Sequence, residues 1–145
     1  MSNYLLFLIM FCGGMAVAVQ PPINARLAQK VGILESAFIS FAIGALVLLL
    51  VVLATGRGSL KGIYGAAWWE LTGGFLGALF VSLTILVVPR IGITAAMAAV
   101  ITAQLSTGLL LDHFGLFGLQ GAPLDLKRLI GAGFLMLGAL LVLKH

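Results

Sequence analysis

The chain has 145 residues, of which 62% are hydrophobic and 8% charged, and a formal net charge of +4. A soluble core cannot hide so much apolar surface in so short a chain, so the composition excludes a soluble globular protein and indicates a polytopic membrane protein. The cations are scattered rather than clustered, which argues against a nucleic-acid partner. The single cysteine, Cys12, excludes a disulfide within the chain and a thiolate metal site.

Five apolar runs are long enough to cross a hydrocarbon core, which takes about 20 helical residues. They cover residues 4–20, with a helical continuation to residue 30, and residues 34–55, 66–88, 93–111 and 129–143. No Lys or Arg precedes the first run, so we expect a retained helix rather than a cleaved signal peptide. The connections are short, so residues 1–145 are expected to form a single all-α transmembrane domain of five helices with antiparallel neighbours.

The cations mark the aqueous ends of these spans, because alternate connections lie on opposite sides of the membrane. One side receives Arg57, Lys61, Lys127 and Arg128, and the other receives Arg26, Lys30, Arg90 and Lys144. The positive-inside rule orients a protein by the difference between such sets, and here the difference vanishes. We therefore predict insertion in both orientations. Two copies would then form an antiparallel homodimer, each copy supplying one half of an inverted repeat, unless a paralogous partner takes the second place.

A proline pair interrupts the pattern of the first run. Pro21 and Pro22 lack N–H groups, so the carbonyls of Val17 and Ala18 lose their helical hydrogen bonds, which is costly in lipid. A helix break is tolerated in a membrane where it lines a cavity or is buried in protein. We predict such a break near residues 20–22; the alternative is a span that ends at Gln20, followed by a segment at the interface.

Amide and hydroxyl side chains near this break are candidates for a binding cavity. Gln20 and Asn24 are spaced four residues apart and so share one helical face. Binding sites of inverted-repeat transporters form at discontinuous helices. We therefore predict a cavity lined by Gln20, Asn24, Gln104 and Ser40, although Ser40 also belongs to a face of small residues that could join helices instead.

A second polar stripe descends along the fourth run. Gln104, Gly108 and Asp112 are spaced four residues apart, and a polar stripe inside a membrane is a pathway hypothesis. Asp112 stands at the negative pole of its helix, where a carboxylate is disfavoured, and His113 beside it can exchange protons near neutral pH. Both residues are candidates for proton or ion coupling; the alternative is that Asp112 is a solvated cap of the following loop.

Glycines recur at spacings that are typical of helix packing in membranes. Gly73 and Gly77 form a GxxxG pair in the third run, and Gly131 and Gly138 stand seven residues apart in the last. Small residues at such positions let two backbones approach closely. We predict contacts between helices at both pairs.

The order of these landmarks resembles that of the DUF606 (YdcZ-like) family in the drug/metabolite transporter superfamily. The residues that carry the resemblance are Gly14, Ala18, Gln20, Pro22, Ile23, Asn24, Leu27, Gly32, Ser40, Phe41, Gly44, Trp68, Trp69, Gly73, Gly74, Gly77, Pro89, Gly92, Gln104, Asp112, His113, Phe114 and Gly115. Ala103 departs from the glycine expected before Gln104. Members occur as five-span single chains, paired genes or ten-span fusions. The resemblance implies a small-molecule transporter of the bacterial inner membrane.

The small multidrug exporters of the same superfamily use a carboxylate in the first helix. The first helix of this chain contains no acid and has Gln20 where an acid would be useful, so proton-coupled cation export is not carried over. Those exporters dimerise through glycines of their last helix, which makes Gly131 and Gly138 candidates for a subunit contact. The leading prediction is a transporter that works by alternating access. A dual-topology ion channel and an accessory membrane subunit are the alternatives. An enzyme, a metal site and a cofactor are not expected, because no nucleophile–base pair, metal-ligand spacing or phosphate-binding loop is present.

Overall fold

The computed structural model describes residues 2–118 and 123–143, which form helices and short connections. The long helices are α1 (Asn3–Val31), α2 (Ile33–Thr55), α3 (Gly73–Ile91), α4 (Ile93–Phe114) and α5 (Leu126–Leu143). Short 3-10 helices complete the described chain: η1 (Leu60–Gly65), η2 (Trp68–Leu71) and η3 (Leu116–Gly118). Five helices among the described residues are long and apolar enough to cross a membrane, which confirms the predicted all-α class with five candidate spans. Lys144, which the charge comparison used, lies outside the described residues.

Polar side chains cap the helices where apolar runs begin. The Ser2 hydroxyl accepts from the backbone N–H of Leu5 at 3.4 Å, ahead of α1. A Glu70 carboxylate oxygen accepts from the Ala67 N–H at 2.7 Å in η2, and Asp125 Oδ1 accepts from the Arg128 N–H at 2.7 Å ahead of α5. Each cap satisfies a backbone donor that a helix N-terminus leaves unpaired.

The first helix continues through both prolines. Pro21 and Pro22 lie inside α1, which is one α-helix from Asn3 to Val31. The predicted helix break near residues 20–22 is therefore wrong. The helix does not end at Gln20 either. Proline fixes φ near the α-helical value, so α1 can continue through the pair, although two helical hydrogen bonds are lost and each ring crowds the carbonyl four residues back. Pro21 is fully buried, which shows that protein rather than lipid surrounds it.

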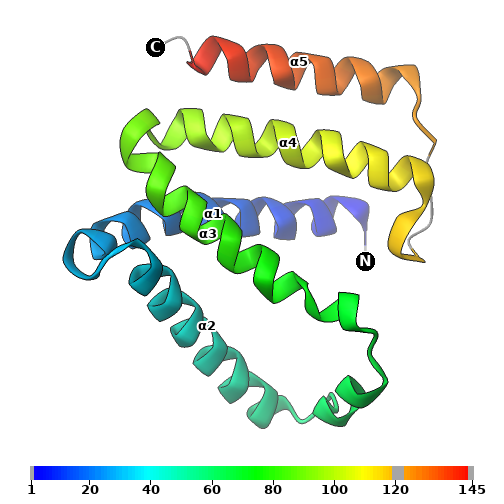
Figure 1. Cartoon of the computed structure of the whole chain (residues 1–145). Coiled ribbons are helices and arrows are strands. Elements are labelled where there is room, and N and C mark those ends of the chain that lie inside the picture. The colour runs from blue at the N-terminus through cyan, green and yellow to red at the C-terminus, as the bar shows by residue number, and fades with distance from the viewer. Residues whose placement is uncertain (1, 119–122, 144–145) are drawn as a thin grey trace. The chain divides into compact units, whose positions relative to one another are not determined.

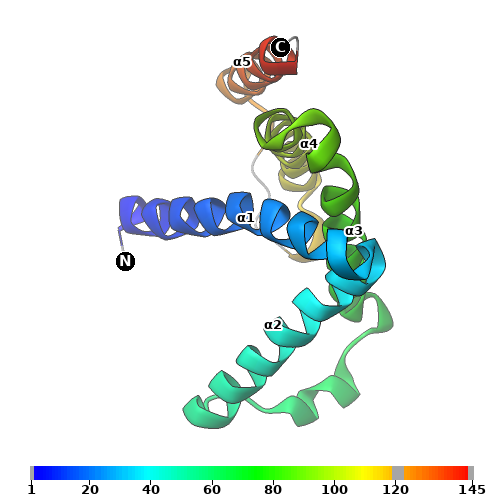
Figure 2. The same ribbon diagram turned by 90° about the vertical axis from the view of Figure 1, so that its left-hand side faces the viewer.

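The chain divides into two compact units, Met1–Arg90 and Ile91–His145. In the first unit, α1 and α2 diverge from the connection between them, as Figures 1 and 2 show from two sides. The core of this unit joins three helices through Ala28 of α1, Ala37 of α2, and Val81 and Ile85 of α3. Because α1 and α2 diverge, this core lies near the connection and leaves the far ends of both helices uncovered within the unit.

Glycines of the predicted packing pairs differ in their surroundings. A Cβ atom added at Gly77 would lie 3.2 Å from the Phe41 ring, so the Phe41 side chain of α2 packs against α3 at this glycine. Added Cβ atoms at Gly73, Gly131 and Gly138 would meet no heavy atom within 4 Å. The packing role predicted for these three glycines therefore has no partner within one copy of the described chain, and the subunit contact at Gly131 and Gly138 stays a prediction.

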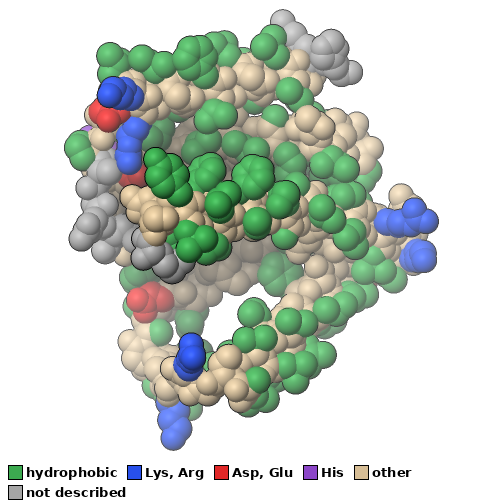
Figure 3. Space-filling view, turned by 180° about the vertical axis from the view of Figure 1, so that it is seen from behind, with side chains coloured by type: hydrophobic (Ala, Val, Ile, Leu, Met, Phe, Trp, Pro, Cys, Tyr) green, Lys and Arg blue, Asp and Glu red, His purple; other side chains and the backbone are tan. Residues whose placement is uncertain are grey.

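The second unit pairs α4 with α5, which lie side by side and run antiparallel (Figure 1). Its buried residues are small, Ala95 and Ala96, both near the start of α4. No residue of the apolar window of α5 is buried. Apolar side chains cover the helices on the face shown in Figure 3, with Lys and Arg near helix ends. This distribution is expected of helices that face lipid instead of a soluble core.

A single residue, Gly32, connects α1 to α2. Its φ of 104° and ψ of 162° fall in a region that only glycine enters readily, and Gly92 joins α3 to α4 with a similar φ of 83° and ψ of 160°. The turn keeps its hydrogen bonds: the Gly32 N–H donates to the Ala28 carbonyl at 2.9 Å, and the Gly32 carbonyl accepts from the Ser36 N–H at 3.0 Å. The helices can therefore reverse direction without exposing unpaired backbone groups.

Replacing Gly32 by alanine is expected to destabilise the protein by about 1–3 kcal/mol, the usual cost of a non-glycine residue in such a region. The thermal unfolding midpoint of the purified protein in detergent measures this change. Gly13→Ala is the matched control, because Gly13 lies inside α1 with open space around it and alanine favours a helix. Equal midpoints for Gly32→Ala and the unmodified protein would contradict the assignment of strain to this turn.

Candidate functional site

A buried amide ties α1 to α2. The Asn24 side chain is 5% exposed, and its Nδ2 donates to Ser40 Oγ at 3.3 Å. The Ser36 hydroxyl, which is fully buried, donates to the backbone carbonyl of Asn24 at 2.8 Å. Polar side chains inside a membrane are expected to be paired in this way, because an unpaired group in lipid is costly.

The turn at Gly32 explains why these residues meet. Asn24 and Ser40 are equally distant from Gly32 along the chain, so reversing direction at that residue brings the two side chains to the same depth. Ser36 and Ser40 are spaced four residues apart and share the face of α2 that looks toward α1. Small hydroxyl side chains on this face let the two helices approach.

A pocket of about 280 Å³ lies beside this network. Its lining residues are Gln20, Ser40, Phe41, Gly44, Ala45 and Leu48. Gln20 and Ser40 supply the polar side chains, and the Gln20 side chain is exposed. No ionisable side chain is among the lining residues. The pocket, called the Gln20 pocket below, can therefore bind a molecule that has an apolar body and a hydrogen-bonding group.

The hydrogen bond from Asn24 determines what Ser40 can offer to a ligand. A hydroxyl has one proton to donate and two lone pairs. Because Ser40 Oγ accepts from the Asn24 amide, its own proton is left for another acceptor. Gln20, with a carbonyl and an NH₂ group, can both donate and accept. Asn24 thus orients the Ser40 hydroxyl, whereas Gln20 and Ser40 line the pocket.

The proline pair adds backbone acceptors to this part of α1. Pro21 and Pro22 cannot donate to the carbonyls of Val17 and Ala18, which therefore lack their helical partners one turn before Gln20. In lipid such carbonyls need a partner from protein, water or a ligand. The amide of Gln20 and the free carbonyls thus concentrate hydrogen-bonding capacity near the middle of α1.

Of the four predicted cavity residues, the first unit brings together Gln20, Asn24 and Ser40. Gln104 lies on α4 in the second unit, where its side chain is exposed, and its place in a common cavity stays a prediction. A separate groove of about 330 Å³ between α4 and α5 is lined mainly by small and apolar residues, including Ala99, Ala103 and Leu140, and Gln104 is not among them.

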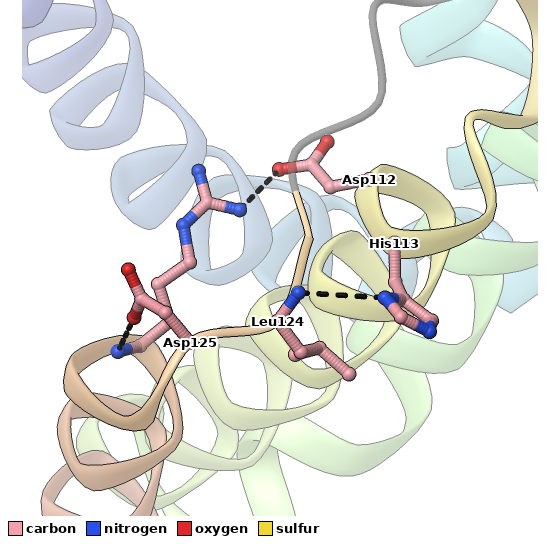
Figure 4. A network of polar contacts seen from close by, with 5 residues as sticks. Asp112, His113, Leu124 and Asp125 are labelled. Atoms are coloured by element: carbon pink, nitrogen blue, oxygen red, sulfur yellow. Dashed lines mark hydrogen bonds and ion pairs between the residues drawn. The ribbon is translucent and has the colours of Figure 1, made fainter.

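Asp112 and His113 lie in the last turn of α4 and contact the start of the α5 segment (Figure 4). Asp112 Oδ2 pairs with Arg128 Nη1 at 3.3 Å, and the Asp112 and Arg128 side chains are 43% and 38% exposed. His113 Nδ1 accepts from the Leu124 N–H at 3.4 Å. Such an exposed ion pair adds about 0–1 kcal/mol to stability.

The Asp112–Arg128 pair was missed by sequence reasoning, which treated Asp112 as a carboxylate disfavoured at a helix C-terminus. The guanidinium supplies the positive charge that this end of α4 favours. A signal existed, because both residues flank the same short connection and carry opposite charges. The coupling role predicted for Asp112 and His113 stays a prediction. Among the described residues, no group of three His, Cys, Asp or Glu side chains could hold a metal ion.

Ser36→Ala is expected to lower the free energy of unfolding by about 0.6–1.7 kcal/mol, the range measured for hydrogen bonds between helices in membranes. Ser82→Ala is the matched control, because the Ser82 hydroxyl donates to the Ala78 carbonyl of its own helix and joins no other helix. Unfolding in mixed micelles, followed by circular dichroism, compares the two. Equal losses for both variants would contradict a tie between α1 and α2 at Ser36.

The chain is similar to known membrane proteins along its length. The profile of the family described as "Putative inner membrane exporter, YdcZ" matches residues 5–141. Inner membrane protein YdcZ of Escherichia coli (strain K12) is 28% identical over 152 aligned residues, which cover 100% of this chain and 99% of that protein. No solved structure matches. The matched residues include the Gln20 pocket, its supporting network and the Asp112–Arg128 pair.

Proposed function

The chain belongs to the YdcZ family of inner membrane exporters, and we propose that it carries a small molecule across the membrane by alternating access. The family and the five apolar helices make it a multi-pass protein of the bacterial inner membrane. Its family is one of transporters rather than enzymes.

The observation that carries the proposal is the polar pocket within otherwise apolar helices. Gln20 and Ser40 line a space of about 280 Å³ between α1 and α2. Polar groups at membrane depth are costly, and they persist where they serve a pathway or a site. Asn24 and Ser36 use their polar groups to hold the helices together, whereas the Gln20 amide is exposed and available to a substrate.

We infer that the working unit is an antiparallel homodimer. The equal division of Lys and Arg between the two sides supports insertion in both orientations. An inverted pair has a two-fold axis in the membrane plane, so exchange of conformations between the two copies would open an equivalent site to either side in turn. Gln104 would join this shared cavity, and Gly131 and Gly138 of α5, which are open within one copy, would contact the partner.

The substrate class follows from the lining of the Gln20 pocket. Because its lining residues include no ionisable side chain, the pocket offers hydrogen bonds but no opposite charge to a bound ion. A formal charge brought into a membrane cavity needs a partner of opposite sign. The pocket therefore favours small uncharged molecules with hydroxyl or amide groups on an apolar body.

Gln20→Ala is expected to weaken transport about tenfold, since the loss of one hydrogen bond of about 1.4 kcal/mol changes affinity by that factor. The protein is produced in exporter-deficient cells, which are screened against a panel of uncharged toxic compounds for resistance. Ser82→Ala is the control for membrane abundance and for the general effect of a lost polar group. Full resistance in Gln20→Ala cells, with equal amounts of protein in the membrane, would contradict the assigned site.

Both orientations are expected in the membrane. With Cys12→Ser as background, a Gly58→Cys substitution places one thiol in the exposed connection between α2 and η1. A membrane-impermeant thiol reagent added outside intact cells should label about half of the molecules, because the charge balance gives no preferred orientation. Permeabilised cells give the total. Labelling from one side only would overturn the antiparallel homodimer and leave either pairing with an oppositely inserted paralogue or parallel assembly.

A further inference from the structure

We propose that the end of the first unit at Gly32 binds the phosphate headgroup of an anionic phospholipid. A second pocket, of about 290 Å³, lies at this end between the last turns of α1, the start of α2 and the last turn of α3. Gln29 and Arg90 are its polar lining residues, and Ala28, Ile33, Ile85 and Pro89 are among the apolar ones. It is called the Arg90 pocket below.

Hydrogen-bond donors converge on the Arg90 pocket. The Arg90 guanidinium donates through Nη1 to the carbonyl of Leu86, one turn earlier on α3. A guanidinium has five N–H donors, so most of them are left for a ligand, and the Gln29 amide adds two more. Paired N–H groups of a guanidinium match the oxygens of a phosphate better than a point charge does.

The charge around this end also favours an anion. Arg26 and Lys30 stand on α1 within a turn of Gln29, and Arg90 ends α3, whereas Glu35 is the acidic residue of this end. The opposite end of the same unit has the cations Arg57 and Lys61 and the acid Glu70, so its side chains sum to +1, against +2 at the end near Gly32. The excess of positive charge therefore lies at the end that has the Arg90 pocket. Basic pockets between membrane helices are typical sites for anionic lipid headgroups.

The apolar walls favour a lipid over a free anion. Ile33, Ile85 and Pro89 give an inorganic phosphate nothing to pair with, but they can contact the glycerol and upper acyl carbons of a lipid. The exposed apolar side chain of Val31, two residues after Gln29 on α1, lies at the same end of the unit. Helix ends lie at the level of the headgroups, so a lipid reaches the pocket without leaving its leaflet.

The test uses the full chain purified in detergent and titrated with phosphatidylglycerol or phosphatidylcholine. Bound lipid is counted by native mass spectrometry. Phosphatidylglycerol is expected to bind at least about fivefold more tightly, and R90Q is expected to remove most of that preference because the fork of donors is lost. R57Q is the matched control, since it removes one cation from an exposed connection without a pocket and should leave the preference unchanged.

A second variant and a competition with inorganic phosphate test the site independently of R90Q. Q29A tests the second donor without changing charge, and it should weaken phosphatidylglycerol binding even if R90Q fails to fold. Inorganic phosphate at millimolar concentration should not displace the lipid. Equal losses in R90Q and R57Q would reduce the effect to unspecific charge attraction and overturn the site, as would full retention of the preference in Q29A and R90Q. Displacement by inorganic phosphate would replace the lipid with a free anion.

Discussion

Every backbone N–H and C=O inside lipid needs a partner from protein, and this constraint leaves the chain few places to change direction. Gly32 solves the problem in one residue, because its φ of 104° lets α2 begin directly where α1 ends. The N–H and carbonyl of Gly32 both stay hydrogen-bonded, so the reversal exposes no polar group. The turn determines which residues of α1 meet which residues of α2, and the polar contacts of the first unit depend on it.

Among the polar residues that the turn brings together, some hold α1 and α2 together and others line the Gln20 pocket. Asn24 and Ser36 are buried, and their side chains form hydrogen bonds between α1 and α2. Ser40 belongs to both groups, since it accepts from Asn24 and lines the Gln20 pocket. Loss of Asn24 would therefore affect a ligand through the orientation of Ser40 rather than through a lost direct contact. The four-residue spacing predicts that Gln20 and Asn24 both line a cavity, whereas only Gln20 lines the pocket and Asn24 supports Ser40.

Hydropathy and length predicted the helices well, because in lipid a long apolar run has no structural alternative to a helix. The ends were less accurate: α5 begins at Leu126, before its apolar run, because Asp125 caps it, so Lys127 and Arg128 lie in its first turn. The break at the proline pair was wrong, since a proline fits the helical φ even where it removes a hydrogen bond. The ion pair of Asp112 depends on the path of a connection, which no periodic pattern encodes.

The distribution of charge has a consequence beyond orientation. The positive-inside rule counts Lys and Arg, which are equal on the two sides, but it gives little weight to the acids. If the spans alternate in direction, three of the four acids, Glu70, Asp112 and Asp125, are expected on the side opposite the Gly32 turn, and Arg128 is paired with Asp112. Fewer acids offset the cations near the turn, so more positive charge is left there to attract anionic lipid headgroups. In an antiparallel pair, one copy would present its turn to each leaflet, so anionic lipids could hold both orientations equally well. Equal numbers of Lys and Arg on the two sides would then leave insertion without a preferred orientation. Because the acids offset these cations on one side only, the positive end of each copy would bind anionic lipids and stabilise the assembled pair in both leaflets.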